Sequence, residues 1–85
     1  MKIYRVKLTR RALAAYQALE LGERQFVYDL IEDFKIGRKL EGDYAEGTHF
    51  FRPTLVKLVS NSAVTYSVDH DAEAVRIVKI DPADR

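Results

Sequence analysis

The sequence has 85 residues, of which 47% are apolar and 32% are charged. This length predicts one domain over residues 1–85, because two domains would each be too small to bury a core, and this composition argues against intrinsic disorder. The absence of cysteine excludes disulfides and thiolate metal sites, and a net charge of +1 excludes a polycation.

The N-terminal segment gives no sign of export or membrane insertion. No apolar run approaches the roughly 18–20 residues that a membrane span needs. The first residues, "MKIYRVKLTRR", contain no apolar signal core. A cytoplasmic protein without a membrane partner is therefore expected.

The first part of the chain predicts a strand followed by two helices. Residues 3–8 alternate between apolar and basic side chains, which is typical of a strand with one buried face. Thr9 is suited to cap a helix over 10–21 that ends at Gly22. A second helix over 23–36 carries apolar side chains at three- and four-residue spacing. Because the link between them is short, we expect an antiparallel helical hairpin.

The second part predicts a polar loop followed by three strands. Residues 37–48 are rich in glycine and charge, which is typical of a loop. Three apolar runs follow, at about 49–59, 63–68 and 74–80, and the short polar segments between them favour antiparallel pairing of consecutive strands. The predicted fold class is α+β: an N-terminal strand, the helical hairpin and a three-stranded antiparallel meander, which form one four-stranded sheet with the helices on one face.

The second helix is expected to hold the core against the sheet. Its apolar stripe should pack on a sheet face built by the first and third predicted strands. The helix residues are Phe26, Leu30, Ile31 and Phe34, and the sheet residues are Tyr4, Val6, Leu8, Val64, Tyr66 and Val68.

Basic residues lie on or beside the predicted strands. Five of them fall in residues 1–11, which contain no acidic residue. A cationic surface of this kind suits a polyanion, but lysine and arginine also protect the edges of sheets, and the charge pattern leaves both interpretations open. The candidates for nucleic-acid binding are Arg5, Lys7, Lys57 and Lys79.

A second set of residues could support metal-independent cleavage of a phosphodiester. That reaction needs cations that stabilise the charge developing on the phosphate, and a group that carries protons. The candidate catalytic residues are Arg52, Arg76, Arg85 and His49. Arg76 and Lys79 are three residues apart, so they share a sheet face only if a bulge intervenes. No metal-binding or phosphate-loop motif is present, so neither a metal nor a cofactor is predicted.

Three segments together resemble the RelE/ParE superfamily of bacterial type II toxins. The segments are "YRVKLTRRALAAYQAL", "ERQFVYDLIEDFKIGRKLEGDY" and "SAVTYSVDHDAEAVRIVKID", and they cover nearly the whole chain. The resemblance implies a sheet packed on a helical hairpin and a cognate antitoxin protein as partner. It also implies growth inhibition by one of two activities: RelE-like members cut mRNA in the ribosomal A site without metal, and ParE-like members act on DNA gyrase.

The C-terminus differs from the nuclease branch of the family. That branch usually carries a histidine or tyrosine after its last strand, whereas Asp81 and Pro82 stand in that region here. The predicted function is a toxin that inhibits translation by ribosome-dependent mRNA cleavage, as a metal-independent endoribonuclease. Two alternatives stay open: a ParE-like inhibitor of DNA gyrase, and a noncatalytic binding module whose open sheet face docks a protein or RNA.

Overall fold

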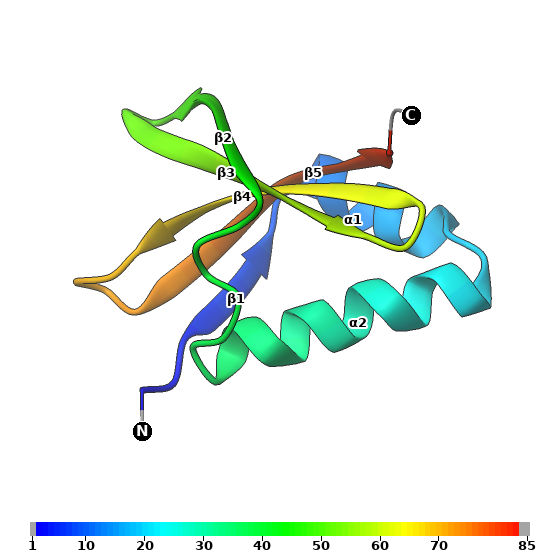
Figure 1. Cartoon of the computed structure of the whole chain (residues 1–85), viewed down its shortest axis with the longest axis horizontal. Helices are drawn as coiled ribbons and strands as arrows, with labels where there is room; N and C mark the ends of the chain where they lie inside the picture. Colours follow the sequence, from blue (N-terminus) through cyan, green and yellow to red (C-terminus); the bar gives the residue numbers. More distant parts are fainter. Residues whose placement is uncertain (1, 84–85) are drawn as a thin grey trace.

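The computed structural model describes residues 2–83. Its elements are β1 (Arg5–Leu8), α1 (Arg10–Ala18), α2 (Leu21–Lys35), β2 (Tyr44–His49), β3 (Arg52–Val59), β4 (Ser62–Asp69) and β5 (Ala74–Pro82). The strands form one sheet in the order β1-β5-β4-β3-β2 (Figure 1). Within this part of the chain, neither helix is long and apolar enough to cross a membrane.

The sheet has five strands, so the prediction of four was wrong. The extra strand, β2, lies in the segment that we expected to be a loop. Its first five residues are exposed, and so no apolar alternation marks it in the sequence. The predicted antiparallel meander of β3, β4 and β5 is confirmed. β1, however, pairs with β5 in the parallel direction, which makes the sheet mixed.

The helices are divided two residues earlier than predicted. Thr9 caps α1 as expected, since its hydroxyl accepts a hydrogen bond from the Ala12 amide at 3.1 Å. Leu19 and Glu20 are extended and separate the helices, whereas Gly22 lies in the first turn of α2. The Arg24 guanidinium fixes this break, because it donates hydrogen bonds to the carbonyls of Gln17 and Leu19, at 2.8 and 3.0 Å, which lie at the C-terminal end of α1 and lack partners within the helix.

The core lies between the helices and one face of the sheet. α2 contributes Val27, Leu30, Ile31 and Phe34, which follow the three- and four-residue spacing of a buried stripe. The strands contribute Val64, Tyr66, Val75, Ile77 and Ile80, and Tyr4 joins them from the residue before β1, with Val6, Leu8 and Val68 partly buried against them. Phe26 was wrongly assigned to this core: its side chain is 54% exposed because Val27 takes the inward position on that turn.

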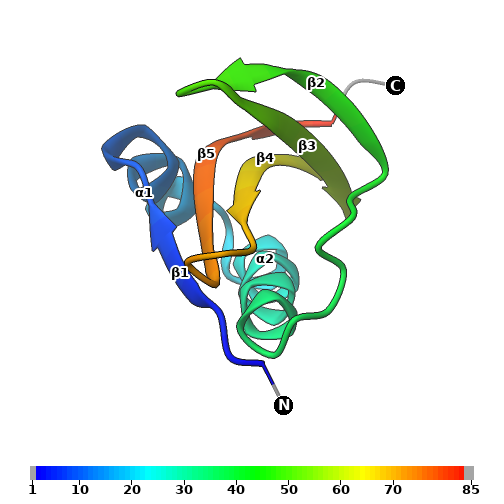
Figure 2. The same ribbon diagram turned by 90° about the vertical axis from the view of Figure 1, so that its left-hand side faces the viewer.

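The face of the sheet away from the helices is curved. Thr54, Val56, Thr65 and Ser67 belong to this face by strand alternation, yet each is at most 5% exposed. These side chains are covered because β2 and β3 arch over β4 and β5, as Figure 2 shows. The bend turns a flat sheet surface into a concave one, and the candidate site lies there.

Candidate functional site

Strand pairing decides which basic side chains share the concave face. Residues that pair across neighbouring strands point to the same side of a sheet. Lys7 pairs with Arg76, and Arg76 pairs with Ser67. Ser67 alternates with the core residue Tyr66, so all three side chains face away from the helices. His49 pairs with Arg52 across the β2–β3 hairpin and lies on the same face.

A bulge in β5 places a further basic residue on this face. Tyr66 pairs with Ile77, but its neighbour Thr65 pairs with Lys79, so Val78 is the extra residue. Arg76 and Lys79 therefore face the same way, as the sequence required for their convergence. The bulge is bound to the cap of α1, because the Thr9 hydroxyl donates a hydrogen bond to the Val78 carbonyl at 2.6 Å.

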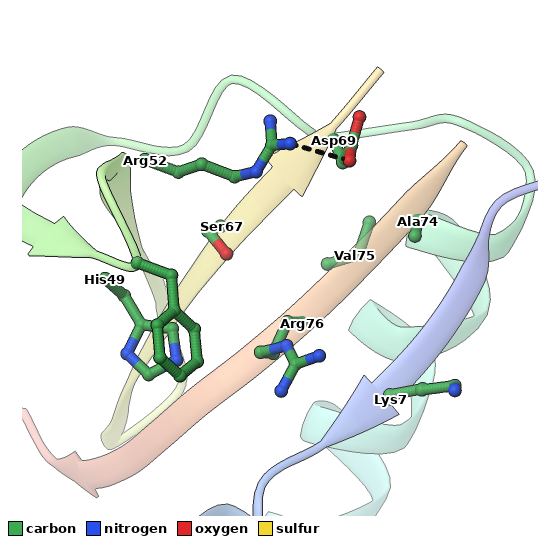
Figure 3. Close-up of a pocket in the computed structure, with 9 residues that line it drawn as sticks. Lys7, His49, Arg52, Ser67, Asp69, Ala74, Val75 and Arg76 are labelled. Carbon is green, nitrogen blue, oxygen red and sulfur yellow. Dashed lines mark hydrogen bonds and ion pairs between the residues drawn. The ribbon is translucent and has the colours of Figure 1, made fainter. Parts of the chain in front are cut away.

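Four of the predicted site residues line one cavity of about 180 Å³: Lys7, His49, Arg52 and Arg76. Phe50, Ser67, Asp69, Ala74 and Val75 complete its lining. Figure 3 shows these side chains on neighbouring strands, with Arg76 between His49 and Lys7. The cavity has the volume of about six water molecules, which is room for an anionic group such as a phosphate.

Arg52 is oriented by a carboxylate at the edge of the cavity. One of its terminal nitrogens donates to Asp69 at 2.8 Å, across β3 and β4 (Figure 3). A guanidinium has five N–H donors, so most of them stay available for a second anion. Asp69 in turn accepts a hydrogen bond from the Ala72 amide at 3.0 Å, which fixes the carboxylate. The pair lowers the local positive charge but holds Arg52 in place.

The positive charges of Arg76 and Lys7 are less neutralised by nearby carboxylates than that of Arg52. Within residues 2–83, the structure shows no carboxylate bonded to either of them. Arg76 instead lies over an aromatic ring, with its guanidinium carbon 6.0 Å from the centroid of Phe50. The ring contacts the face of the guanidinium, so the N–H donors at its edge remain available to other groups.

His49 is the residue in the cavity best suited to carry protons. Its side chain is half-buried, and its ring packs against Phe50 with centroids 4.5 Å apart. Its Nε2 atom is buried and has no hydrogen-bond partner among the described residues. A buried polar atom without a partner is unfavourable, and a ligand hydroxyl in the cavity could provide the missing hydrogen bond.

The other predicted site residues lie outside this cavity. Lys57 pairs with the core residue Val64, so it belongs to the opposite face, where it binds Asp43 at 3.1 Å. Lys79 is on the concave face but contacts Glu46 and Asp81, at 3.9 and 3.6 Å. Arg5 is on the concave face of β1, exposed and outside the cavity lining. Arg85 lies outside the described residues.

Tyr66 could carry protons by its residue type, but it is enclosed in the core, where the sequence predicted it. Its side chain has no exposed surface, and its hydroxyl donates to the carbonyls of Lys39 and Leu40, both at 3.1 Å. Burial, together with the charges of Glu41 and Asp43, raises the pKa of Tyr66 above its ordinary value. The phenol therefore stays protonated and serves the packing of the core.

Sequence reasoning missed five of the nine lining residues, and two of these, Phe50 and Asp69, contact its predicted arginines. We expected Phe50 to lie in a continuous strand over 49–59, and Asp69 falls in the polar segment that we expected to link the strands over 63–68 and 74–80. The adjacent phenylalanines at 50 and 51 did not indicate a turn, because two-residue turns between strands usually contain glycine or asparagine. The pairing of Asp69 with Arg52 depends on strand register, and no local pattern in the sequence reveals it.

Solved structures of RelE toxins have a fold similar to this one. A chain of the archaeal RelE–RelB complex from Pyrococcus horikoshii superposes with a TM-score of 0.79 at 18% identity, over 100% of this chain and 99% of that one. The isolated E. coli RelE toxin gives 0.72 at 20% identity, over 96% and 86% of the two chains. The RelBE2 toxin–antitoxin complex from Mycobacterium tuberculosis gives 0.63 at 17% identity, over 98% and 94%.

Sequence comparison adds no relative to these structures. No protein-family model matches the sequence, and no curated protein matches it either. At identities of 16–21%, the solved structures establish the fold. The chain therefore has a RelE/ParE-like toxin fold over nearly its whole length.

Proposed function

We propose that the whole chain forms one toxin domain of a type II toxin–antitoxin pair, which acts in the bacterial cytoplasm and inhibits translation by cleaving mRNA at the ribosome. The observation that carries this proposal is the convergence of Lys7, Arg52, Arg76 and His49 on one concave cavity. The RelE toxin fold supports it, because the similar structures are toxins and toxin–antitoxin complexes.

The cavity has the groups that RNA cleavage without metal requires. Arginine binds phosphate oxygens in pairs and keeps its charge at any working pH, so Arg52 and Arg76 would hold the scissile phosphate and stabilise its developing charge. His49 Nε2 would take the proton of the ribose 2′-hydroxyl. The 2′-oxygen then bonds to phosphorus, the bond from phosphorus to the 5′-oxygen breaks, and water supplies the proton for that oxygen. The products are a 2′,3′-cyclic phosphate and a 5′-hydroxyl.

The proposed partner is a cognate antitoxin that covers this face. The similar structures from Pyrococcus horikoshii and Mycobacterium tuberculosis are toxin–antitoxin complexes. The cationic cavity favours an acidic segment in the partner, since opposite charges steer association and fix its register. Binding of the antitoxin should therefore weaken with rising salt and should bury Arg52 and Arg76.

A second candidate function is the binding of a protein target, such as DNA gyrase, without cleavage. The enclosure of Tyr66 favours it, because His49 is then the one imidazole or phenol side chain among the described residues that line the cavity. Cleavage normally uses both a general base and a general acid. Under this candidate, the arginines would bind acidic groups of the target protein.

Induction of the chain without an antitoxin tests both candidates in one experiment. Protein synthesis, the 5′ ends of cellular mRNA and the supercoiling of a plasmid are followed in the same culture. The proposal predicts that synthesis falls and new mRNA ends appear while supercoiling stays unchanged. Altered supercoiling with intact mRNA would replace it by the gyrase candidate, and normal growth with a folded protein would contradict both toxin functions.

The double variant Arg52→Ala/Arg76→Ala should remove the effect on synthesis. Lys57→Ala is the matched control, because it removes a positive charge from the same sheet on the opposite face. If both variants stay folded and the control is inactive as well, the effect depends on overall charge rather than on the cavity.

A further inference from the structure

The connection between β2 and β3 is a two-residue turn built of phenylalanines. His49 pairs with Arg52, and Phe50 and Phe51 lie between them. Both have positive φ angles, of 50° and 66°, as in the type I′ turn that joins twisted strands. Asparagine and glycine favour this conformation, whereas a bulky side chain is unfavourable in it. The sequence therefore keeps two aromatic residues where the backbone favours other residue types.

These two side chains contribute little to the core. Phe50 is 74% exposed and Phe51 is fully exposed. Large apolar side chains that remain in water do not gain the free energy of burial, so the packing of the fold does not explain them. An exposed apolar group beside a concave surface is typical of a binding site.

The chemistry around the turn indicates what would bind there. The Phe50 ring lies 6.0 Å from the Arg76 guanidinium carbon and 4.5 Å from the ring centroid of His49, at the edge of the cationic cavity. A ligand that uses both features must carry negative charge next to a flat apolar group. A single-stranded nucleic acid has this combination in every nucleotide, since its phosphate suits the cations and its base can stack on an aromatic ring.

We propose that the Phe50–Phe51 turn is a stacking platform for the bases of single-stranded RNA. Phe50 stacks on the base next to the phosphate held by Arg52 and Arg76, and Phe51 meets the following base at the exposed tip. The inference rests on the proposed function, because it assigns further contacts to the same RNA. Stacking is tolerant of base identity, so the turn would add affinity rather than sequence specificity.

Binding of a fluorescein-labelled oligoadenosine to the purified protein tests the platform by fluorescence anisotropy. Phe50→Ala should weaken binding by about 5- to 150-fold, the range reported for losing one base–aromatic stack. Phe50→Trp should keep the affinity and Phe50→Leu should lose it, because leucine is apolar but has no π-face. Phe26→Ala is the matched control, since it removes a half-exposed phenylalanine from α2. A strand of the same charge without bases should bind wild type and Phe50→Ala equally.

The double variant Phe50→Asn/Phe51→Gly separates binding from folding. It installs the residues that a type I′ turn favours, so its thermal midpoint should equal or exceed that of wild type while its RNA affinity falls. Equal affinity of wild type, Phe50→Ala and Phe50→Leu would overturn the platform. So would the loss of binding to anionic lipid vesicles in Phe50→Ala with RNA binding intact, which would identify the turn as a membrane contact.

Failure of the platform and failure of the nuclease proposal give different results. If the protein binds RNA through Phe50 but leaves cellular mRNA intact, the platform stands and the cleavage reaction falls. If the protein cleaves mRNA and Phe50→Ala binds as tightly as wild type, the cleavage reaction stands and the platform falls.

Discussion

Replacing Tyr66 by phenylalanine should lower stability without changing activity. The Tyr66 hydroxyl is shared between the carbonyls of Lys39 and Leu40. The ring packs at 4.5 Å from that of Phe34. Gly42 closes the space beside the hydroxyl, because a Cβ on that glycine would lie 2.9 Å from the tyrosine oxygen. Phenylalanine keeps the ring and its packing and removes only the donor.

The magnitude follows from the exposure of the two carbonyls. A buried acceptor that loses its donor costs about 1–3 kcal/mol. Because Lys39 lies on an exposed segment, water can reach one of the carbonyls, and we expect the lower part of this range, about 1–2 kcal/mol. For a domain of this size, each kcal/mol shifts the thermal midpoint by about 4–8 °C. The midpoint should fall by about 4–16 °C.

Two assays on the same variant complete the test. Thermal unfolding followed by circular dichroism gives the midpoint, and induction without an antitoxin gives the growth arrest. The account predicts a lower midpoint with full arrest at a temperature where the variant is folded. A folded Tyr66→Phe protein that had lost its activity would refute the reasoning, because the phenol would then have to reach the substrate.

Three further predictions concern the supports of the site. Phe34→Ala should cost about 3–5 kcal/mol in chemical unfolding, since its ring is completely buried; a cost within about 0.5 kcal/mol would contradict that placement. Thr9→Ala should lower the free energy of unfolding by about 0.5–2 kcal/mol through the lost cap. Thr9→Ser should keep the stability of wild type, because serine retains a hydroxyl that can bind Ala12 and Val78. If the serine variant were as unstable as the alanine variant, the hydroxyl would have no such role. The hydrogen bond from the Leu58 amide, and then that from Lys57, lower the pKa of Asp43 below its ordinary value. The stabilising effect of the carboxylate is therefore present above about pH 4 and is lost as the pH falls through the depressed pKa. Asp43→Asn should destabilise the protein at pH 7 and have a smaller effect near pH 2, and an equal effect at both values would contradict this.

The elements with strong apolar periodicity could be predicted from the sequence. The α2 stripe and the β3–β4–β5 meander were predicted in type and order, and Leu30, Phe34 and Tyr66 were correctly assigned to the core. These predictions succeed because burial of one face imposes a period of 3.6 or 2 on the chain. β2 could not be predicted, since its side chains are exposed and polar and only pairing with β3 defines it.

The composition of the site depends on register, which the sequence does not display. Arg76 and Lys79 share a face only because Val78 bulges. Lys57 is basic and lies in the same strand as Arg52, yet it pairs with the core residue Val64 and therefore faces the opposite side of the sheet. The basic residues could be chosen as candidate anion-binding groups from their type alone, but which of them line one cavity needed the structure. The roles of Arg52, Arg76 and His49 in cleavage stay predictions.

Cleavage of a defined mRNA on purified ribosomes, followed by the length of its fragments, tests the central claim most directly. The account predicts that the wild-type protein cuts the message and that Arg76→Ala lowers the rate by about 10²–10³-fold, with unchanged circular dichroism and with Lys57→Ala close to wild type. Cleavage by Arg76→Ala at the wild-type rate, or loss of activity in Lys57→Ala to the same extent, would contradict the assignment of the reaction to the concave cavity.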